Sequence, residues 1–211
     1  MVVTPGTILK NLDAEYDYVA IIDCLPKADR ATYRLSHSLM DVLHGLSYGF
    51  TTYPCDTLDG FRWAHAKIQQ RAEAGHPAVI VLVGHGDKAR IGIGESGDSM
   101  NWVDLARLWA PINAAMGGTL LVMMTTCEGI NAISASASTL GEPFFGLIGT
   151  KEKLLVADAR AINERFFKGL RDGIDIKIFI EEAEKTWGDN FVRGITGEFW
   201  RALKGHTGNL T

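Results

Sequence analysis

Two residues with reactive side chains, one histidine and one cysteine, each follow closely on an uninterrupted apolar run. His85 comes just after the run 78–83, and Cys127 comes just after the run 119–125. Runs of about six residues rich in Val, Ile, Leu and Met, without polar alternation, are typical of strands that are covered on both faces in a parallel sheet. Such sheets carry their chemistry at the carboxyl ends of the strands. The sequence therefore places His85 and Cys127 where catalytic residues are expected.

These two residues become a catalytic pair only if their strands are neighbours. Adjacent strands lie about 4.8 Å apart, so His85 and Cys127 would then leave the sheet side by side. A thiol with a pKa near 8.5 is mostly protonated at neutral pH, and an imidazole that takes its proton activates it as a nucleophile. Two simpler interpretations stay open. A single cysteine at a strand end is often a small buried hydrophobe, and a histidine there often satisfies a loop carbonyl.

Composition limits the class of protein. The chain has 211 residues, 46% of them hydrophobic, and we expect a single domain over 1–211, with 1–15 as a lead-in of low structure. A net charge of −4 gives no reason to expect nucleic acid or a membrane as a partner. The sequence has neither an apolar stretch of membrane-spanning length nor the features of a signal peptide. Three cysteines form no disulfide framework, so we expect reduced thiols and a cytoplasmic location.

The alternation of apolar runs with amphipathic segments predicts a three-layer α/β fold, with a mostly parallel central sheet flanked by helices. Strands are expected at 18–22, 48–53, 78–83, 119–125 and 143–148. Helices are expected at 30–46 after an Asp29 cap, 58–72 after Asp56 or Thr57, 102–109 after Asn101 and up to a break at Pro111, 158–170 after Asp158, and 174–187. Segment 191–200 contains two glycines and reads poorly as a strand, so we expect a monomer.

Several other features predict structure rather than chemistry. Segment 92–97 formally matches a dinucleotide fingerprint, but it does not follow a first strand and reads better as a hairpin beside the active-site rim. The small residues 134–138 predict a loop. Cys24 and Cys55 end two strands that are expected to be adjacent, and we interpret them as packing residues; a disulfide or half of a metal site is the alternative. The other histidines lack zinc-ligand spacing, so no metal is predicted.

The order of these motifs resembles a known family. A hydrophobic strand ending in His-Gly, a second one ending in Thr-Cys-Glu-Gly 42 residues on, and then Ala-Arg-Ala-Ile-Asn-Glu-Arg-Phe-Phe-Lys-Gly-Leu-Arg-Asp-Gly resemble the caspase-like cysteine peptidases. Within that superfamily, 144–187 is most similar to CHAT domains. Two features depart from the pattern. The Trp-x-Val-x-Asp stretch common in CHAT domains is replaced at 149–158, and the long processing linker of caspases is absent, so activation by cleavage there is not expected.

The resemblance implies a caspase-like fold and a cysteine endopeptidase that cleaves a protein or peptide substrate, with a regulatory protein partner as an option. It implies that His85 is the base, Cys127 the nucleophile, and the backbone amides of Gly86 and Cys127 the oxyanion hole, with no metal or cofactor. Asp87 follows its histidine too closely to be expected as a third catalytic member. Two other functions stay open: a catalytically silent scaffold, and a thiol hydrolase or acyltransferase acting on non-peptide esters.

The resemblance also indicates which loops would hold the residue before the scissile bond. They are 23–30, 125–126 and 149–153, which contribute the candidate substrate-binding residues Asp23, Arg30, Thr125, Lys151 and Lys153. A guanidinium at Arg30, with a lysine opposite, favours an acidic side chain. Asp23 or Asp29 would reverse the sign of this pocket, and an arginine in a first helical turn is often merely solvated. Thr125, two residues before the cysteine, is uncharged.

Overall fold

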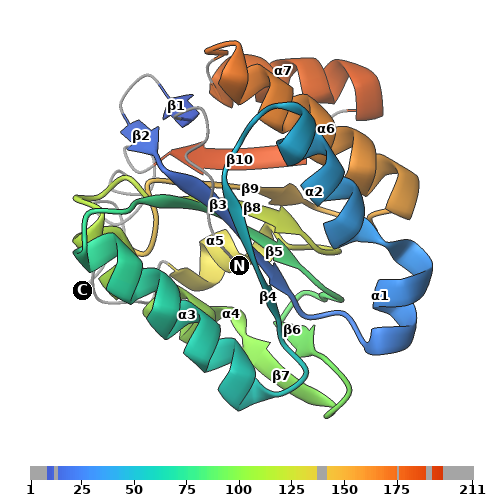
Figure 1. Cartoon of the computed structure of the whole chain (residues 1–211). Coiled ribbons are helices and arrows are strands. Elements are labelled where there is room, and N and C mark those ends of the chain that lie inside the picture. Colours follow the sequence, from blue (N-terminus) through green and yellow to red (C-terminus); the bar gives the residue numbers. More distant parts are fainter. Residues whose placement is uncertain (1–8, 12–13, 137–141, 175, 189–191, 197–211) are drawn as a thin grey trace, which may run out of the picture.

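A computed structural model describes residues 9–11, 14–136, 142–174, 176–188 and 192–196, and its centre is a six-stranded sheet (Figure 1). The strand order is β10-β9-β8-β5-β3-β4, with β10 antiparallel to β9 and the other neighbours parallel. The bounds are β3 Tyr18–Asp23, β4 Phe50–Pro54, β5 Ala78–Val83, β8 Leu121–Thr125, β9 Gly146–Thr150 and β10 Val192–Thr196. Two small hairpins lie outside it, β1 Leu9–Asn11 with β2 Ala14–Tyr16, and β6 Arg90–Ile93 with β7 Asp98–Asn101.

Helices cover both faces of this sheet and make it the middle of three layers. Helices α3, α4 and α5 lie on one face, and α2, α6 and α7 lie on the other (Figure 1). The bounds are α1 Lys27–Tyr33, α2 Leu35–Gly45, α3 Leu58–Glu73, α4 Trp102–Ala115, α5 Asn131–Ser136, α6 Val156–Arg171 and α7 Ile176–Trp187. Among the described residues, no helix combines the length and the apolar character needed to cross a bilayer.

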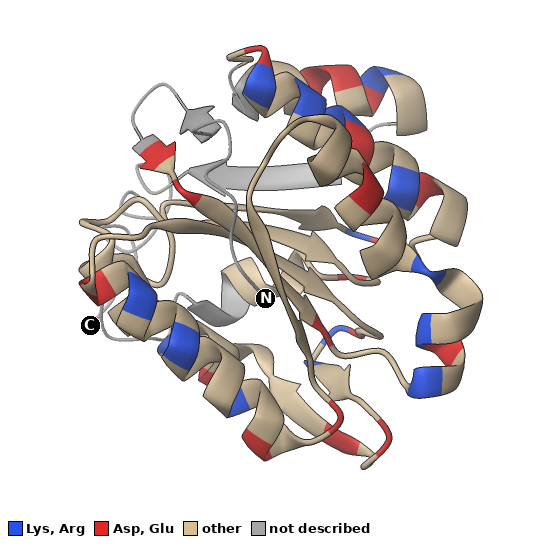
Figure 2. Ribbon diagram, in the orientation of Figure 1, with Lys and Arg blue, Asp and Glu red and all other residues tan. Residues whose placement is uncertain are grey.

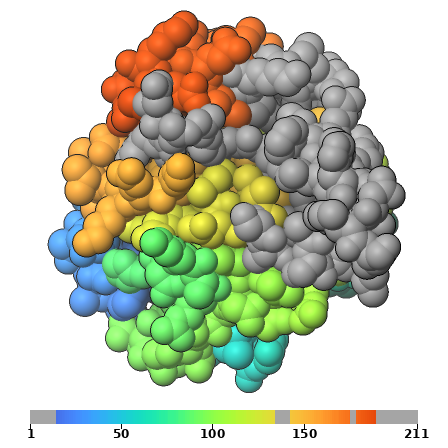
Figure 3. Space-filling model, turned by 180° about the vertical axis from the view of Figure 1, so that it is seen from behind, coloured from blue at the N-terminus to red at the C-terminus, as the bar shows by residue number. Residues whose placement is uncertain are grey.

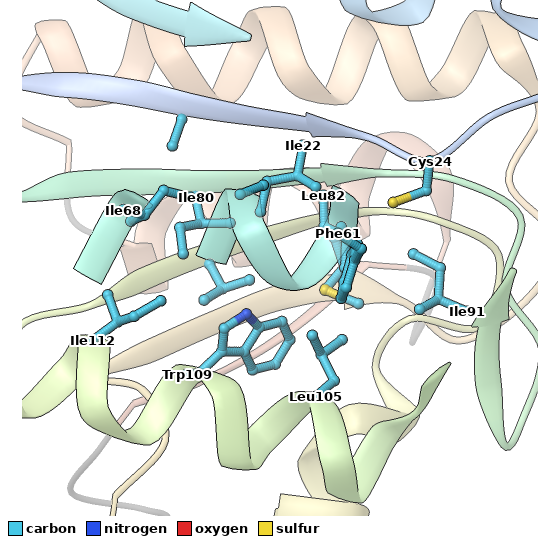
Figure 4. Packing of buried hydrophobic residues seen from close by; sticks show 14 of the residues in the cluster. Ile22, Cys24, Phe61, Ile68, Ile80, Leu82, Ile91, Leu105, Trp109 and Ile112 are labelled. Atoms are coloured by element: carbon cyan, nitrogen blue, oxygen red, sulfur yellow. The ribbon is translucent and has the colours of Figure 1, made fainter. Parts of the chain in front are cut away.

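Alternation of side chains along each strand divides the core into two apolar clusters. In β3, Ala20 and Ile22 pack toward α3 and α4, whereas Val19 and Ile21 pack toward α2 and α6. Phe61 and Trp109 fill the first cluster from the two helices that cover it (Figure 4). Charged side chains lie mainly on helices and loops, while the central strands are almost free of them (Figure 2). The continuous apolar runs thus reflect burial on both faces.

Much of the predicted element pattern is confirmed. The predicted α/β layers, the mostly parallel sheet and the hairpin at 92–97 are present. Thr57 caps α3 by accepting a hydrogen bond from the Gly60 amide, and Asn101 caps α4 through the Asp104 amide. The ambiguous segment 174–187 contains helix α7, as predicted.

The single helix predicted at 30–46 is wrong. Arg34 adopts a left-handed conformation, with φ of 50°, and separates α1 from α2. The apolar stripe that suggested one helix belongs to α2 alone, because α1 has no buried residue. Asp29 lies in the first turn of α1 and does not cap it.

Other boundaries differ from the prediction because packing overrides local signals. Helix α4 continues past Pro111, which lies on its exposed side, because Trp109 and Ile112 are both fixed in the core. Helix α6 starts at Val156, ahead of the predicted Asp158 cap, whose carboxylate instead accepts from the Trp187 indole. The small residues predicted as a loop at 134–138 begin within α5, and 137–138 lie outside the described residues.

The two ends of the described chain contain strands that the sequence did not predict. Residues 9–11 and 14–16 pair as a hairpin, where we expected low structure. Segment 192–196 pairs with β9 over five residues, from Val192 opposite Thr150 to Thr196 opposite Gly146. Glycine weakens strand propensity, but an edge strand that finds a continuous backbone partner tolerates it. The strand predicted at 143–148 is present as β9, displaced by a few residues to Gly146–Thr150.

Candidate active site

Strand register brings His85 and Cys127 to the same point of the sheet edge. Strands β5 and β8 are parallel neighbours, and their last registered pair is Val83 with Thr125. His85 and Cys127 each follow two residues later, and both line a small cavity of about 50 Å³, here called the Cys127 cavity. The predicted adjacency of the two strands is therefore confirmed, and an imidazole and a thiol line one cavity.

Cys127 sits at a sharp turn that leaves its sulfur accessible. The next residue, Glu128, has a left-handed φ of 53°, and its amide donates to the Glu152 carbonyl at 3.1 Å. The Leu154 amide donates to the Cys127 Sγ at 3.3 Å. A non-glycine residue in this conformation is strained, and such strain is common where a nucleophile must project from a strand end. The turn thus holds a half-buried thiol at the cavity wall.

Gly86 lies against the backbone of the Cys127 turn. A Cβ atom at this position would lie 2.6 Å from the Cys127 carbonyl oxygen, so the close approach requires glycine. Gly86 opposes Ile91 in an antiparallel bridge whose hydrogen bonds come from the flanking residues, His85 to Gly92 and Asp87 to Arg90. In such a pair the central amide points away from its partner. The Gly86 N–H is thus available to a ligand at the sheet edge.

The His85 ring is held by two residues of α1. Its Nε2 lies 2.7 Å from Asp29 Oδ2, and the Tyr33 ring packs edge-on against it at 6.3 Å between centroids. His85 is 53% exposed and Asp29 32% exposed. Sequence analysis considered Asp29 only as a helix cap or a charge in the substrate pocket and missed this contact. A signal existed, because Asp29 lies in the segment that follows β3, and β3 is the strand next to β5.

Asp87, the acidic residue nearest to His85 in sequence, makes its hydrogen bonds within its own loop. Its Oδ1 accepts from the amides of Ala89 at 2.7 Å and Arg90 at 3.0 Å. The Ala89 bond is the main cause of a lowered Asp87 pKa, assisted by the Arg90 amide and side chain. The carboxylate thus serves the loop that carries the β6–β7 hairpin.

Arg30 is a structural tether in this conformation, and it does not line the Cys127 cavity. Its guanidinium is 17% exposed and pairs with Asp23 at 3.4 Å and with Asp56 at 3.1 Å. It also donates to the backbone carbonyls of Asp23 and Leu25. Asp23 is itself buried and further accepts from Ser36 Oγ at 2.6 Å. Both predicted substrate-binding residues thus have their charges paired inside the protein.

The remaining predicted substrate-binding residues separate into two groups. Thr125 lines the Cys127 cavity, and its hydroxyl donates to Asn163 Oδ1 at 3.0 Å. Lys151 and Lys153 are exposed and do not contribute to the lining. The cavity walls are mostly apolar and consist of Leu25, Tyr33, Leu35, Gly84, His85, Thr125, Thr126, Cys127, Leu154, Val156 and Ala159.

A second, larger hollow of about 310 Å³ opens between the segment after β3 and the β6–β7 hairpin, and we call it the hairpin groove. His85 and Gly86 line it too, together with Cys24, Pro26, Asp87, Arg90, Gly92, Ile93, Gly94, Gly97, Asp98 and Ser99. Figure 3 shows this face of the molecule, where α1 (blue), the chain after β5 (green), the turn after β8 (yellow) and the chain before α6 (orange) meet. His85 thus lines both hollows.

Cys24 and Cys55 are free and buried. Burial raises the Cys24 pKa well above its ordinary value, and a hydrogen bond with Cys55 adds to the rise. The packing interpretation fits these two thiols, and no disulfide links them. Within the described ranges, no group of three or more metal-binding side chains could hold a metal ion.

No family model and no curated protein matches the chain in sequence. Among solved structures, it is similar to caspase-1 from Spodoptera frugiperda, with a TM-score of 0.54 over 90% of this chain and 95% of that chain. The chain has a caspase-like fold. Sequence identity to that caspase is 12%, so the likeness concerns fold alone. The predicted fold class is confirmed, and the similarity to CHAT domains stays a prediction.

Proposed function

We propose that this protein is a caspase-like cysteine endopeptidase with a Cys127–His85 dyad. The observation that carries the proposal is the register of β5 and β8, which puts both side chains on the wall of one cavity at the carboxyl edge of the sheet. A thiol beside an imidazole in a cleft is the arrangement needed for nucleophilic acyl transfer. The caspase-like fold supports peptidase chemistry over other uses of the same pair.

The proposed reaction proceeds in two steps. His85 takes the Cys127 proton while sulfur attacks the substrate carbonyl, and the carbonyl electron pair moves to oxygen. The resulting oxyanion is stabilised by the backbone amides of Gly86 and Cys127. When the intermediate collapses, the C–N bond breaks and His85 returns its proton to the leaving amine. Water then hydrolyses the thioester, with His85 acting again as base.

The cavity beside Cys127 supports a preference for a small uncharged side chain before the scissile bond. Leu25, Leu35, Leu154 and Ala159 give it apolar walls, and its volume of about 50 Å³ suits a side chain of few heavy atoms. Because Arg30 is already paired with two carboxylates and does not line the cavity, an acidic side chain would gain little from it there. This geometry thus favours alanine or valine over the acidic residue that the sequence suggested.

Digestion of a proteome-derived peptide library tests the activity and the preference together. Wild type is expected to cleave, Cys127→Ala to be silent, and Cys55→Ala to cleave like wild type because it removes a thiol remote from the cavity. Cleavage after Ala or Val supports the apolar pocket, whereas cleavage mainly after Asp would return Arg30 to the substrate site. A silent library combined with hydrolysis of a simple thioester would instead identify a thiol hydrolase. Inactivity on both would leave a scaffold.

The three free thiols support a reducing, cytoplasmic setting for this activity. We further propose that the substrate is a protein or an extended peptide. The hairpin groove and the Cys127 cavity share His85 in their walls, so an extended chain that passes His85 can reach both. A compact small-molecule ester would use only one of them.

A further inference from the structure

Helix α1 presents two residues to the imidazole of His85. Asp29 accepts at Nε2 over 2.7 Å, and Tyr33, four residues later and therefore on the same face of the helix, packs edge-on against the ring. Neither contact comes from the strand that carries His85. The orientation of the ring is thus set by a separate element, 56 residues away in sequence.

We propose that Asp29 is the positioning residue of the dyad, so that the site works as a Cys127–His85–Asp29 triad. The catalytic role of Asp29 rests on the proposed function, whereas its hydrogen bond to His85 is present in the structure whatever the function is. Asp29 touches only the imidazole, and it acts on the reaction through His85.

The chemistry follows from which ring nitrogen carries the proton. An ionised carboxylate only accepts hydrogen bonds, so the Asp29 contact keeps the proton on His85 Nε2. Nδ1 then has a free electron pair that can take the Cys127 proton. As the S–H bond breaks, the new N–H bond makes the ring an imidazolium, and the carboxylate 2.7 Å away stabilises this charge. The same proton later passes from Nδ1 to the leaving amine, so acylation requires no other proton donor or acceptor.

Arg30 explains how a helix without buried residues keeps Asp29 in place. Its guanidinium joins α1 to the end of β3 through the Asp23 and Leu25 carbonyls, and to the segment after β4 through Asp56. Asp29 precedes Arg30 directly, so fixing one fixes the other. The residue that sequence analysis assigned to substrate binding instead anchors the helix that orients the base.

Other charged groups around His85 are engaged elsewhere. Asp87 is bonded to the amides of its own loop, and Arg90 lies 3.5 Å from Asp87. Asp98, across the hairpin groove, accepts from the Leu58 amide. Among the described residues, Asp29 is accordingly the carboxylate that contacts the ring. Asp41→Asn, at an exposed position of α2 that lines neither hollow, provides the matched control, because it removes a carboxylate without touching the imidazole.

The test measures Cys127 alkylation by iodoacetamide between pH 5.5 and 9.5 on the full chain, read by mass spectrometry of the Cys127 peptide. We expect Asp29→Asn to slow alkylation about tenfold near pH 7, with the difference disappearing toward pH 9.5, because ordinary thiols need no base to ionise at high pH. Solvent screening at this partly exposed pair keeps the effect below that of a buried triad. Asp29→Glu, which keeps the charge, should recover part of the rate, and Asp41→Asn should match wild type.

Two outcomes would overturn the inference. One is an Asp29→Asn profile that follows wild type throughout while His85→Ala loses the neutral-pH reactivity. The other is an equal loss in Asp29→Asn and Asp41→Asn, which would reflect only general charge. With a cleavable peptide, kcat should fall about 10-fold to 100-fold in Asp29→Asn with little change in KM. If wild type cleaves no peptide, the peptidase proposal fails, but the alkylation profile still decides the role of Asp29.

Discussion

Replacing His65 by leucine should remove a specific acid sensitivity of the fold. His65 lies on the buried face of α3. Its Nδ1 is 2.9 Å from the Phe61 carbonyl oxygen, and its Nε2 has no partner among the described residues. Burial lowers its pKa from 6.5 to about 4. The ring is therefore neutral in the folded protein at pH 7, donating from Nδ1.

The sign of the effect follows from proton linkage. Below pH 6.5 the unfolded chain protonates His65 while the folded chain does not, so stability falls as the pH decreases toward 4. The loss relative to neutral pH is about 2 kcal/mol at pH 5 and about 3 kcal/mol at pH 4, from the difference between the two pKa values. Leucine has a similar volume and cannot be protonated, so His65→Leu should remove this part of the dependence of stability on pH.

Urea unfolding of wild type and His65→Leu at pH 7, 5 and 4 tests this prediction. At each pH, the difference between the two free energies of unfolding is free of the contribution of the carboxylates, which both proteins share. The gap between His65→Leu and wild type should widen in favour of the variant by about 2 kcal/mol from pH 7 to 5. His44→Leu, at an exposed position of α2, is the control and should keep the wild-type slope. Parallel curves for His65→Leu and wild type would refute a buried neutral imidazole.

Three further predictions concern the sheet edge. Without denaturant, one thiol, Cys127, should react with a chromogenic disulfide reagent, and Cys24 and Cys55 should react only after unfolding, since both are buried; three fast thiols would contradict the packing. Gly86→Ala should lose at least about 100-fold in peptide cleavage and should also lower the melting temperature, because its Cβ would meet the Cys127 carbonyl oxygen at 2.6 Å and displace the backbone there; full activity would remove Gly86 from the site. Glu128→Gly should raise the free energy of unfolding by about 1 kcal/mol, because glycine adopts the φ of 53° without strain. Urea titration measures this change, and a decrease would contradict the prediction.

The sheet and the shared position of His85 and Cys127 were predictable because their signals are local. Continuous apolar runs identify strands that are buried on both faces, and the rule that chemistry lies at carboxyl ends places His85 with Cys127 once β5 and β8 are assumed to be neighbours. The Thr57 and Asn101 caps are equally local, since each bonds an amide three residues away.

The surroundings of the dyad were not predictable, because they depend on contacts between distant segments. The helix break at Arg34 is a left-handed arginine, a conformation that side-chain periodicity does not indicate. Arg30 is neutralised by Asp23 and Asp56, which come from two different strand ends. Strand β10 forms because the edge of β9 offers it a backbone partner in register, and its glycines give no sign of this.

Helix α1 also has a consequence for how the protein loses activity. It spans seven residues, buries none of them, and is held largely by polar contacts of Arg30, Lys27 and Tyr33, whereas β5 and β8 are buried along their whole length. Amide exchange should accordingly report opening of α1 long before the strands open. Each such opening separates Asp29 and Tyr33 from His85 while the thiol and the imidazole stay on intact strands. If His85 is the base that we propose, its competence is a local equilibrium, which heat, mild denaturant or a protein that binds α1 can shift without unfolding the domain.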